Sequence, residues 1–123
     1  GIPTMLVTGP GHILMAFDTG IPADRRSEVS AQADLIVEHD GSIWVPVEVT
    51  LVGSSFLDAW LSAAAQYQVW REDEVLSTHE LADAWNIYPP TSVPDTGWDP
   101  AVPSRSVLQR RMDSELAQLR GLQ

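Results

Sequence analysis

Hydrophobic residues in the first 50 positions follow the short, interrupted pattern of β-strands. The opening stretch GIPTMLVTGPGHILMAFD holds two apolar runs separated by Gly-Pro-Gly, which predicts two strands joined by a tight turn. Residues 19–32, rich in Asp, Arg and Ser, are expected to form a polar loop. Asp40 and Gly41 suit a two-residue hairpin turn between strands at residues 35–37 and 43–51. The pattern therefore predicts an antiparallel sheet of about four strands.

The pattern changes to helical spacing after the second hairpin. Ser55 and Asp58 have the arrangement of a capping box, which predicts a helix over about residues 55–71. A shorter helix is expected to begin at Thr78, whose hydroxyl can cap it, and to end before Pro89. The apolar stripe of the long helix, with two tryptophans assigned to packing, consists of Phe56, Ala59, Trp60, Ala63, Tyr67 and Trp70.

Prolines divide the chain into three predicted parts. Residues 89–103 contain five prolines, a density that favours an extended linker. This linker separates a folded domain at residues 1–88 from a C-terminal helix at residues 104–123, which Ser104 or Ser106 can cap. The apolar stripe of this last helix consists of Leu108, Met112, Leu116 and Leu119. The predicted fold class is α+β, with the long helix packed on the antiparallel sheet.

The composition is that of an acidic globular domain. The chain has 123 residues, of which 44% are hydrophobic and 20% charged, and its net charge is -10. The negative charge lies in the first 100 residues, whereas the C-terminal helix carries a slight excess of Arg. An acidic surface repels phosphate backbones and anionic lipids, so nucleic acid is not expected as a partner. No apolar run approaches the roughly 20 residues that a membrane span needs.

The chain contains no cysteine, which excludes a disulfide, a Cys-ligated zinc ion and a thiol nucleophile within these residues. His79 and Asp83 lie four positions apart on the predicted short helix and could share a metal ion. The zinc-protease pattern requires a second histidine at the position of Asp83, so a solvated helix start is the preferred interpretation. His39 is expected to be exposed near the hairpin turn and is given no role. The sequence thus predicts no metal site and no cofactor.

Two residues of catalytic type fall on predicted strands. His12 opens one strand, and Glu48 lies in the middle of another, on the same side as Trp44. If these strands are neighbours, the carboxylate can fix the tautomer of the imidazole and leave its other nitrogen free to activate a nucleophile. The alternative is a core histidine bonded to a backbone carbonyl and a glutamate facing solvent, and spacing alone favours this alternative.

The order of GIPT, GHILMAF and IWVPVEVT resembles the second half of a transglutaminase-like catalytic domain, a papain-related α+β fold. In that family a Gly-Ile-Pro turn leaves the helix with the nucleophilic cysteine, a histidine opens the next strand, and a Trp-Val-Pro-Val-acid-x-Thr strand supplies the third residue. The resemblance covers about the first 50 residues. It implies that His12 is the base, that Glu48 orients it, that Trp44 borders the substrate cleft, and that peptide or protein amides are the substrates. A packing role for Trp44 is the alternative.

The sequence departs from the family pattern in three places. Most relatives have aspartate where this chain has Glu48, and an alanine and an aromatic residue where it has Ile13 and Leu14. The cysteine is missing and is expected upstream of Gly1 in a parent chain. Two functions therefore stay open: the inert His-and-acid half of a cysteine-nucleophile enzyme, or a non-catalytic binding or adaptor module. Unpaired strand edges also make a homodimer or domain swap conceivable.

Overall fold

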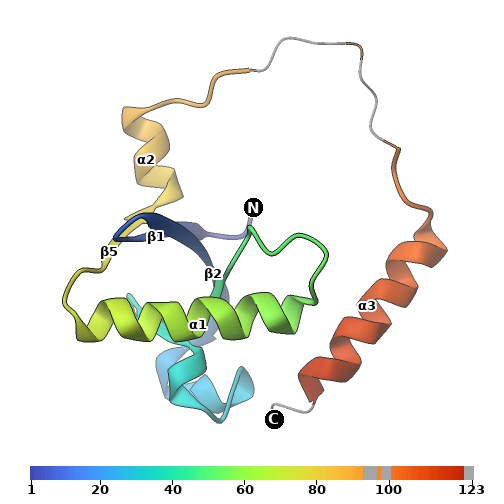
Figure 1. The fold of residues 1–123 in the computed structure, drawn as a ribbon, viewed down its shortest axis with the longest axis horizontal. Coiled ribbons are helices and arrows are strands. Elements are labelled where there is room, and N and C mark those ends of the chain that lie inside the picture. The colour runs from blue at the N-terminus through green and yellow to red at the C-terminus, as the bar shows by residue number, and fades with distance from the viewer. Residues whose placement is uncertain (93–96, 98–100, 121–123) are drawn as a thin grey trace.

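The computed structural model describes residues 1–92, 97 and 101–120, and its fold is α+β with one antiparallel sheet (Figure 1). The strands lie in the order β3-β4-β2-β1-β5, so β3 and β5 are the edges. Two short 3-10 helices, Ala23–Glu28 and Ala33–Leu35, connect β2 to β3. The remaining elements are β1 (Thr4–Gly9), β2 (His12–Pro22), β3 (Val37–His39), β4 (Ser42–Val47), α1 (Phe56–Glu72), β5 (Ser77–Glu80), α2 (Leu81–Ile87) and α3 (Arg105–Leu119).

Both predicted hairpins are confirmed. Gly9 and His12 form the last pair of the β1–β2 ladder, and Gly11 supplies the positive φ angle that the turn requires. In the β3–β4 hairpin, Asp40 and Gly41 both have positive φ, as a two-residue turn of the primed type demands. The predicted first arm at residues 35–37 was wrong in part, because Leu35 ends a 3-10 helix and β3 begins only at Val37.

Three other boundaries correct the sequence prediction. The polar loop starts later than residue 19, because β2 continues past an irregularity and pairs Pro22 with Ser42. The second arm of the hairpin ends at Val47 rather than Leu51, since the next backbone N–H leaves the sheet. Thr78 does not cap a helix. It lies in β5, which pairs with β1, and α2 starts three residues later.

Helix α1 covers one face of the sheet and buries its predicted stripe (Figure 1). Ser55 caps it: the Ser55 hydroxyl accepts the backbone N–H of Asp58, whose carboxylate accepts the backbone N–H of Ser55. The Trp60 indole N–H donates to the backbone oxygen of Leu35, which fastens the helix to the connection before β3. Two adjoining groups of buried residues form the core, one with Met5, Val7, Leu14, Ala16, Trp44, Ala63, Tyr67 and Trp70, the other with Ile36, Ile43, Val45, Trp60 and Ala64.

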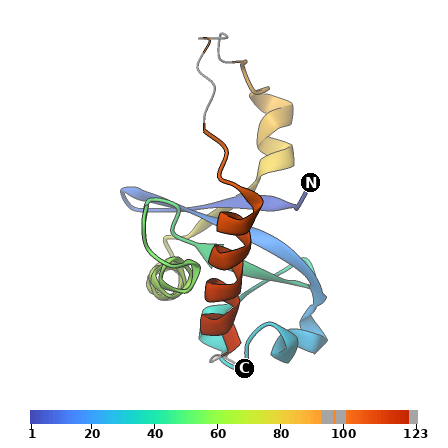
Figure 2. The same cartoon turned by 90° about the vertical axis from the view of Figure 1, so that its right-hand side faces the viewer.

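Helix α3 lies beside the end at which α1 begins, as the views in Figures 1 and 2 agree. The carboxylate of Glu115 accepts the backbone N–H of Phe56 at 2.8 Å, where the dipole of α1 favours negative charge. Arg111 donates to the backbone oxygen of Ser54 at 2.9 Å. Of the predicted apolar stripe, Leu119 packs against the core, whereas about half of each side chain stays exposed at Leu108, Met112 and Leu116. Among the described helices, none has the length and apolar character required to cross a membrane.

Candidate active site

His12 stands at the start of β2, where the β1–β2 turn fixes its backbone. Gly9, directly opposite, lies beneath the indole of Trp70, and a Cβ atom there would come within 2.2 Å of that ring. Glycine is therefore required at position 9 by close approach rather than by its backbone angles. The same indole meets the imidazole of His12 edge-on, with ring centroids 6.3 Å apart. The first hairpin and the end of α1 together set the position of the histidine ring.

Glu48 immediately follows β4 and is held from two sides. Its backbone N–H donates to the carbonyl of Ala59 in α1, which draws the chain away from the sheet. One carboxylate oxygen, Oε1, accepts both the backbone N–H of Thr50 at 2.9 Å and its hydroxyl at 2.5 Å. The other, Oε2, is 2.5 Å from Nε2 of His12. The structure thus brings together the two residues that the sequence singled out, although Glu48 lies past the end of its strand and not in the middle.

The surroundings of Glu48 favour its ionised form. Burial, which leaves the residue 8% exposed, raises the pKa of the carboxyl group, but hydrogen bonds from Thr50 and His12 lower it by more. The net pKa lies below the usual range, so Glu48 is a carboxylate at neutral pH. A carboxylate only accepts hydrogen bonds, and Nε2 of His12 must therefore carry a proton. In the neutral imidazole Nδ1 is then the basic nitrogen, and it has no hydrogen-bond partner within the described part of the chain.

An open hollow of about 550 Å³ borders His12. Its lining is mostly apolar, with Leu6, Ile13 and Met15 from the first two strands and Val49 from the segment after β4. Ile13 in β2 and Val49 in the segment after β4 are each 51% exposed. His12 therefore borders an uncovered apolar surface.

Trp44 lies in the core and does not line this hollow. It is 4% exposed, packs with the residues under α1, and has an indole N–H without a partner among the described residues. This position agrees with the packing alternative for Trp44. The aromatic side chain beside His12 is instead Trp70, which the sequence pattern had assigned to packing alone. Thr50 was also missed as a site residue, although it stands inside the motif WVPVEVT.

Comparison with known proteins adds no relative to this description. The chain matches no family model, no curated protein and no solved structure. Its function is therefore inferred from the geometry of His12 and Glu48 and from the resemblance carried by the sequence motifs.

Proposed function

We propose that this chain is the His-and-acid half of a transglutaminase-like domain that acts on peptide or protein amides with a cysteine nucleophile. The observation that carries the proposal is the contact of Glu48 with Nε2 of His12, because it leaves Nδ1 as the basic, unoccupied nitrogen. The cysteine belongs to an upstream segment of a parent polypeptide, as the resemblance implies. Without that segment the chain is inert.

The chemistry divides between the two residues and the added thiol. Nδ1 of His12 removes the proton of the cysteine thiol, and the thiolate attacks the amide carbonyl to give a tetrahedral adduct. As the C–N bond breaks, the same proton passes from Nδ1 to the leaving amine, and a thioester remains. Water or a second amine then releases the acyl group. Glu48 contacts the imidazole and Thr50 but none of the reacting atoms, so it is a positioning residue that stabilises the imidazolium between the two proton transfers.

The exposed apolar surface beside His12 supports an upstream segment as the missing part. A helix of the upstream segment that packed on Ile13 and Val49, which line the same hollow as His12, would remove these side chains from water. A cysteine at the N-terminus of such a helix, next to His12, would have a lowered pKa and react as the thiolate.

The test uses the full-length polypeptide labelled with iodoacetamide near neutral pH. We expect one cysteine upstream of Gly1 to react fast, and His12→Ala to slow it by on the order of tenfold or more. Glu48→Asp, which restores the acid common in the family, should retain more of this reactivity than Glu48→Ala. His79→Ala is the matched control and should change nothing. A parent chain without a fast-reacting cysteine would contradict the proposal and favour the non-catalytic binding module.

A further inference from the structure

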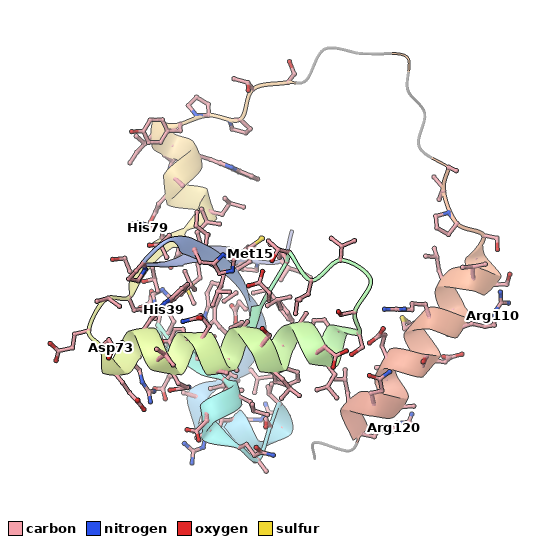
Figure 3. The ribbon with its side chains drawn as sticks, viewed as in Figure 1. Met15, His39, Asp73, His79, Arg110 and Arg120 are labelled. Carbon is pink, nitrogen blue, oxygen red and sulfur yellow. The ribbon has the colours of Figure 1, made fainter. Side chains whose placement is uncertain are left out.

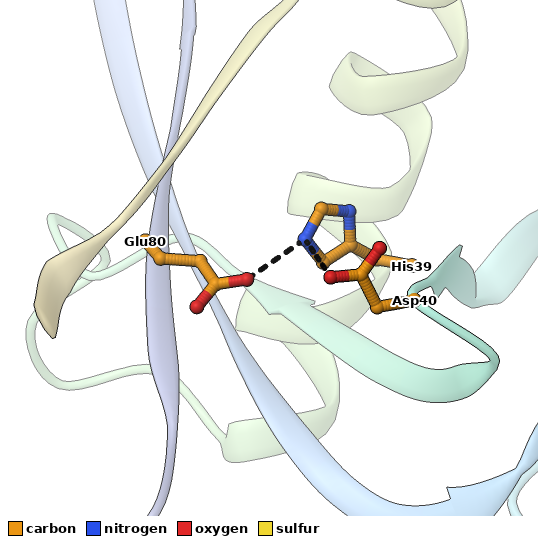
Figure 4. Close-up of side chains that lie close together, drawn as sticks. All are labelled: His39, Asp40 and Glu80. Atoms are coloured by element: carbon orange, nitrogen blue, oxygen red, sulfur yellow. Dashed lines mark hydrogen bonds and ion pairs between the residues drawn. The ribbon is translucent and has the colours of Figure 1, made fainter. Parts of the chain in front are cut away.

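A second cluster of ligand-type side chains lies away from His12, at the β5 side of the molecule (Figures 3 and 4). His39, Asp40 and Glu80 each offer one metal-ligand atom, and these atoms lie within 4.8 Å of one another. Nε2 of His39 is 3.2 Å from the Glu80 carboxylate and 3.9 Å from that of Asp40. The sequence pattern gave His39 no role and considered only His79 with Asp83 as metal ligands.

The cluster joins the two opposite edges of the sheet. His39 pairs with Ser42 at the β3 edge, and Glu80 pairs with Met5 at the β5 edge. Paired side chains of antiparallel strands point to the same face. Ser42 lies on the same face of β4 as Pro46, which pairs with Ala16, and Ala16 pairs with Met5. Both ligands therefore lie on the face where Met5 and Ala16 pack against α1. The curl of the sheet thus brings its first and last strands into contact through these side chains.

His39 has the features of a pre-oriented ligand. Its ring stands edge-on to the buried indole of Trp44, with centroids 5.5 Å apart, and its side chain is 27% exposed. This packing restricts rotation of the imidazole while Nε2 faces the two carboxylates (Figure 4). Ligands whose orientation is fixed by neighbouring groups lose little freedom when they bind a metal ion.

The charge around the cluster is uncompensated. The three residues border a pocket of about 490 Å³ whose lining also includes His79 and Asp83. Among the residues that the structure describes, no arginine lines this pocket, and the sequence contains no lysine. Three carboxylates therefore share one pocket without a permanent cation among its lining residues, which is the electrostatic setting in which a bound cation is favoured.

We propose that His39, Asp40 and Glu80 bind a divalent transition-metal ion such as Zn²⁺. An imidazole ligand favours Zn²⁺ over Mg²⁺ or Ca²⁺, which prefer oxygen ligands alone. Bonds of roughly 2.0–2.2 Å require tetrahedral ligand atoms about 3.4 Å apart. The His39–Glu80 distance meets this spacing, and rotation of the exposed Asp40 side chain supplies the third ligand. The ion would tie the β3–β4 hairpin to β5 and keep a fourth position for water.

The test is a titration of the whole chain with Zn²⁺ against a chromophoric chelator, together with thermal unfolding. We expect one Zn²⁺ per chain, a rise in the unfolding temperature on binding, and no such rise with Mg²⁺. Glu80→Gln keeps the shape of the side chain and should weaken Zn²⁺ binding more than tenfold while the metal-free protein stays folded. His39→Ala should weaken it at least as much.

Two matched variants separate this cluster from the other histidines. His12→Ala removes the histidine paired with Glu48, and His79→Ala removes the other histidine of the pocket. Both should bind Zn²⁺ as the unaltered chain does. Absence of stoichiometric binding, binding that survives Glu80→Gln, or binding that is lost in His12→Ala would each overturn the proposal.

Discussion

Two histidine–glutamate pairs in this protein have the same chemistry and different surroundings. Glu48 is 8% exposed and accepts hydrogen bonds from both groups of Thr50 as well as meeting His12. The Glu80 side chain is 40% exposed, and His39 is its partner at 3.2 Å. In the first pair the carboxylate is buried and hydrogen-bonded at both oxygens. In the second pair the carboxylate is exposed to solvent, and Asp40 lies next to the histidine.

Because of this difference in burial, the hydrogen bond between His12 and Glu48 is fixed, whereas the one between His39 and Glu80 can be exchanged. A buried carboxylate with several donors cannot release its histidine without leaving polar groups unpaired, so the tautomer of His12 is set by the fold. In an exposed pair, water can replace the contact between His39 and Glu80 at little cost in free energy. Nε2 of His39 can therefore donate its lone pair to a metal ion. The glutamate of the first pair thus orients the imidazole of His12, whereas the histidine and glutamate of the second pair are suited to binding a metal ion.

The largest expected difference is in stability. Glu48→Ala should lower the free energy of unfolding by about 3 kcal/mol, because the donors of Thr50 and His12 lose a buried acceptor. Glu80→Ala should lower it by less than about 1 kcal/mol, as for an exposed ion pair. Urea unfolding followed by tryptophan fluorescence measures both. Equal losses in the two variants would show that burial does not distinguish the pairs.

A smaller loss of stability should follow from disturbing the packing of Trp70, which contacts the His12 ring. Gly9→Ala places a methyl group against the Trp70 indole and should cost about 2 kcal/mol, with a changed near-ultraviolet circular dichroism spectrum. Gly11→Ala is the matched control: its Cβ meets nothing within 4 Å, and only its positive φ is strained, at about 1 kcal/mol. If the control costs as much as Gly9→Ala, Trp70 does not fix the position of His12.

Local chemistry made the turns and the helix start near the first pair predictable, whereas the pair itself was singled out by the family resemblance. The Asp40-Gly41 turn and the capping box at Ser55 are encoded by adjacent residues, and both are present as expected. The hairpins alone did not place His12 next to Glu48, because they pair β1 with β2 and β3 with β4, whereas the contact requires the pairing of β2 with β4. The end of β4 was not predictable from its alternation, because the N–H of Glu48 goes to α1, a contact that no pattern within the strand records.

The second pair, His39 and Glu80, could not be predicted from the sequence, because its contact depends on non-local geometry. The residues of β5 are Ser-Thr-His-Glu, which have no apolar alternation, and this edge strand is held by its backbone pairing with β1. His39 and Glu80 are 41 residues apart and stand on opposite edges. Their contact depends on the curl of the whole sheet, a property to which every strand contributes and which no single segment of the sequence specifies.

The finest contrast between the pairs lies in the pH dependence of stability. The pKa of Glu48 is lower in the folded chain than its usual value near 4.5, so the unfolded chain binds more protons at acid pH. The stabilisation from ionised Glu48 is complete above that value and is lost as the pH falls through the lower, folded pKa. Glu48→Gln should therefore differ most from the unaltered chain at pH 7 and least at pH 3 in urea unfolding. Glu80→Gln leaves the contacts of Glu48 intact, so its free energy of unfolding should depend on pH in the same way as that of the unaltered chain. If the difference in unfolding free energy between Glu48→Gln and the unaltered chain is constant with pH, the charge of Glu48 has no part in holding His12.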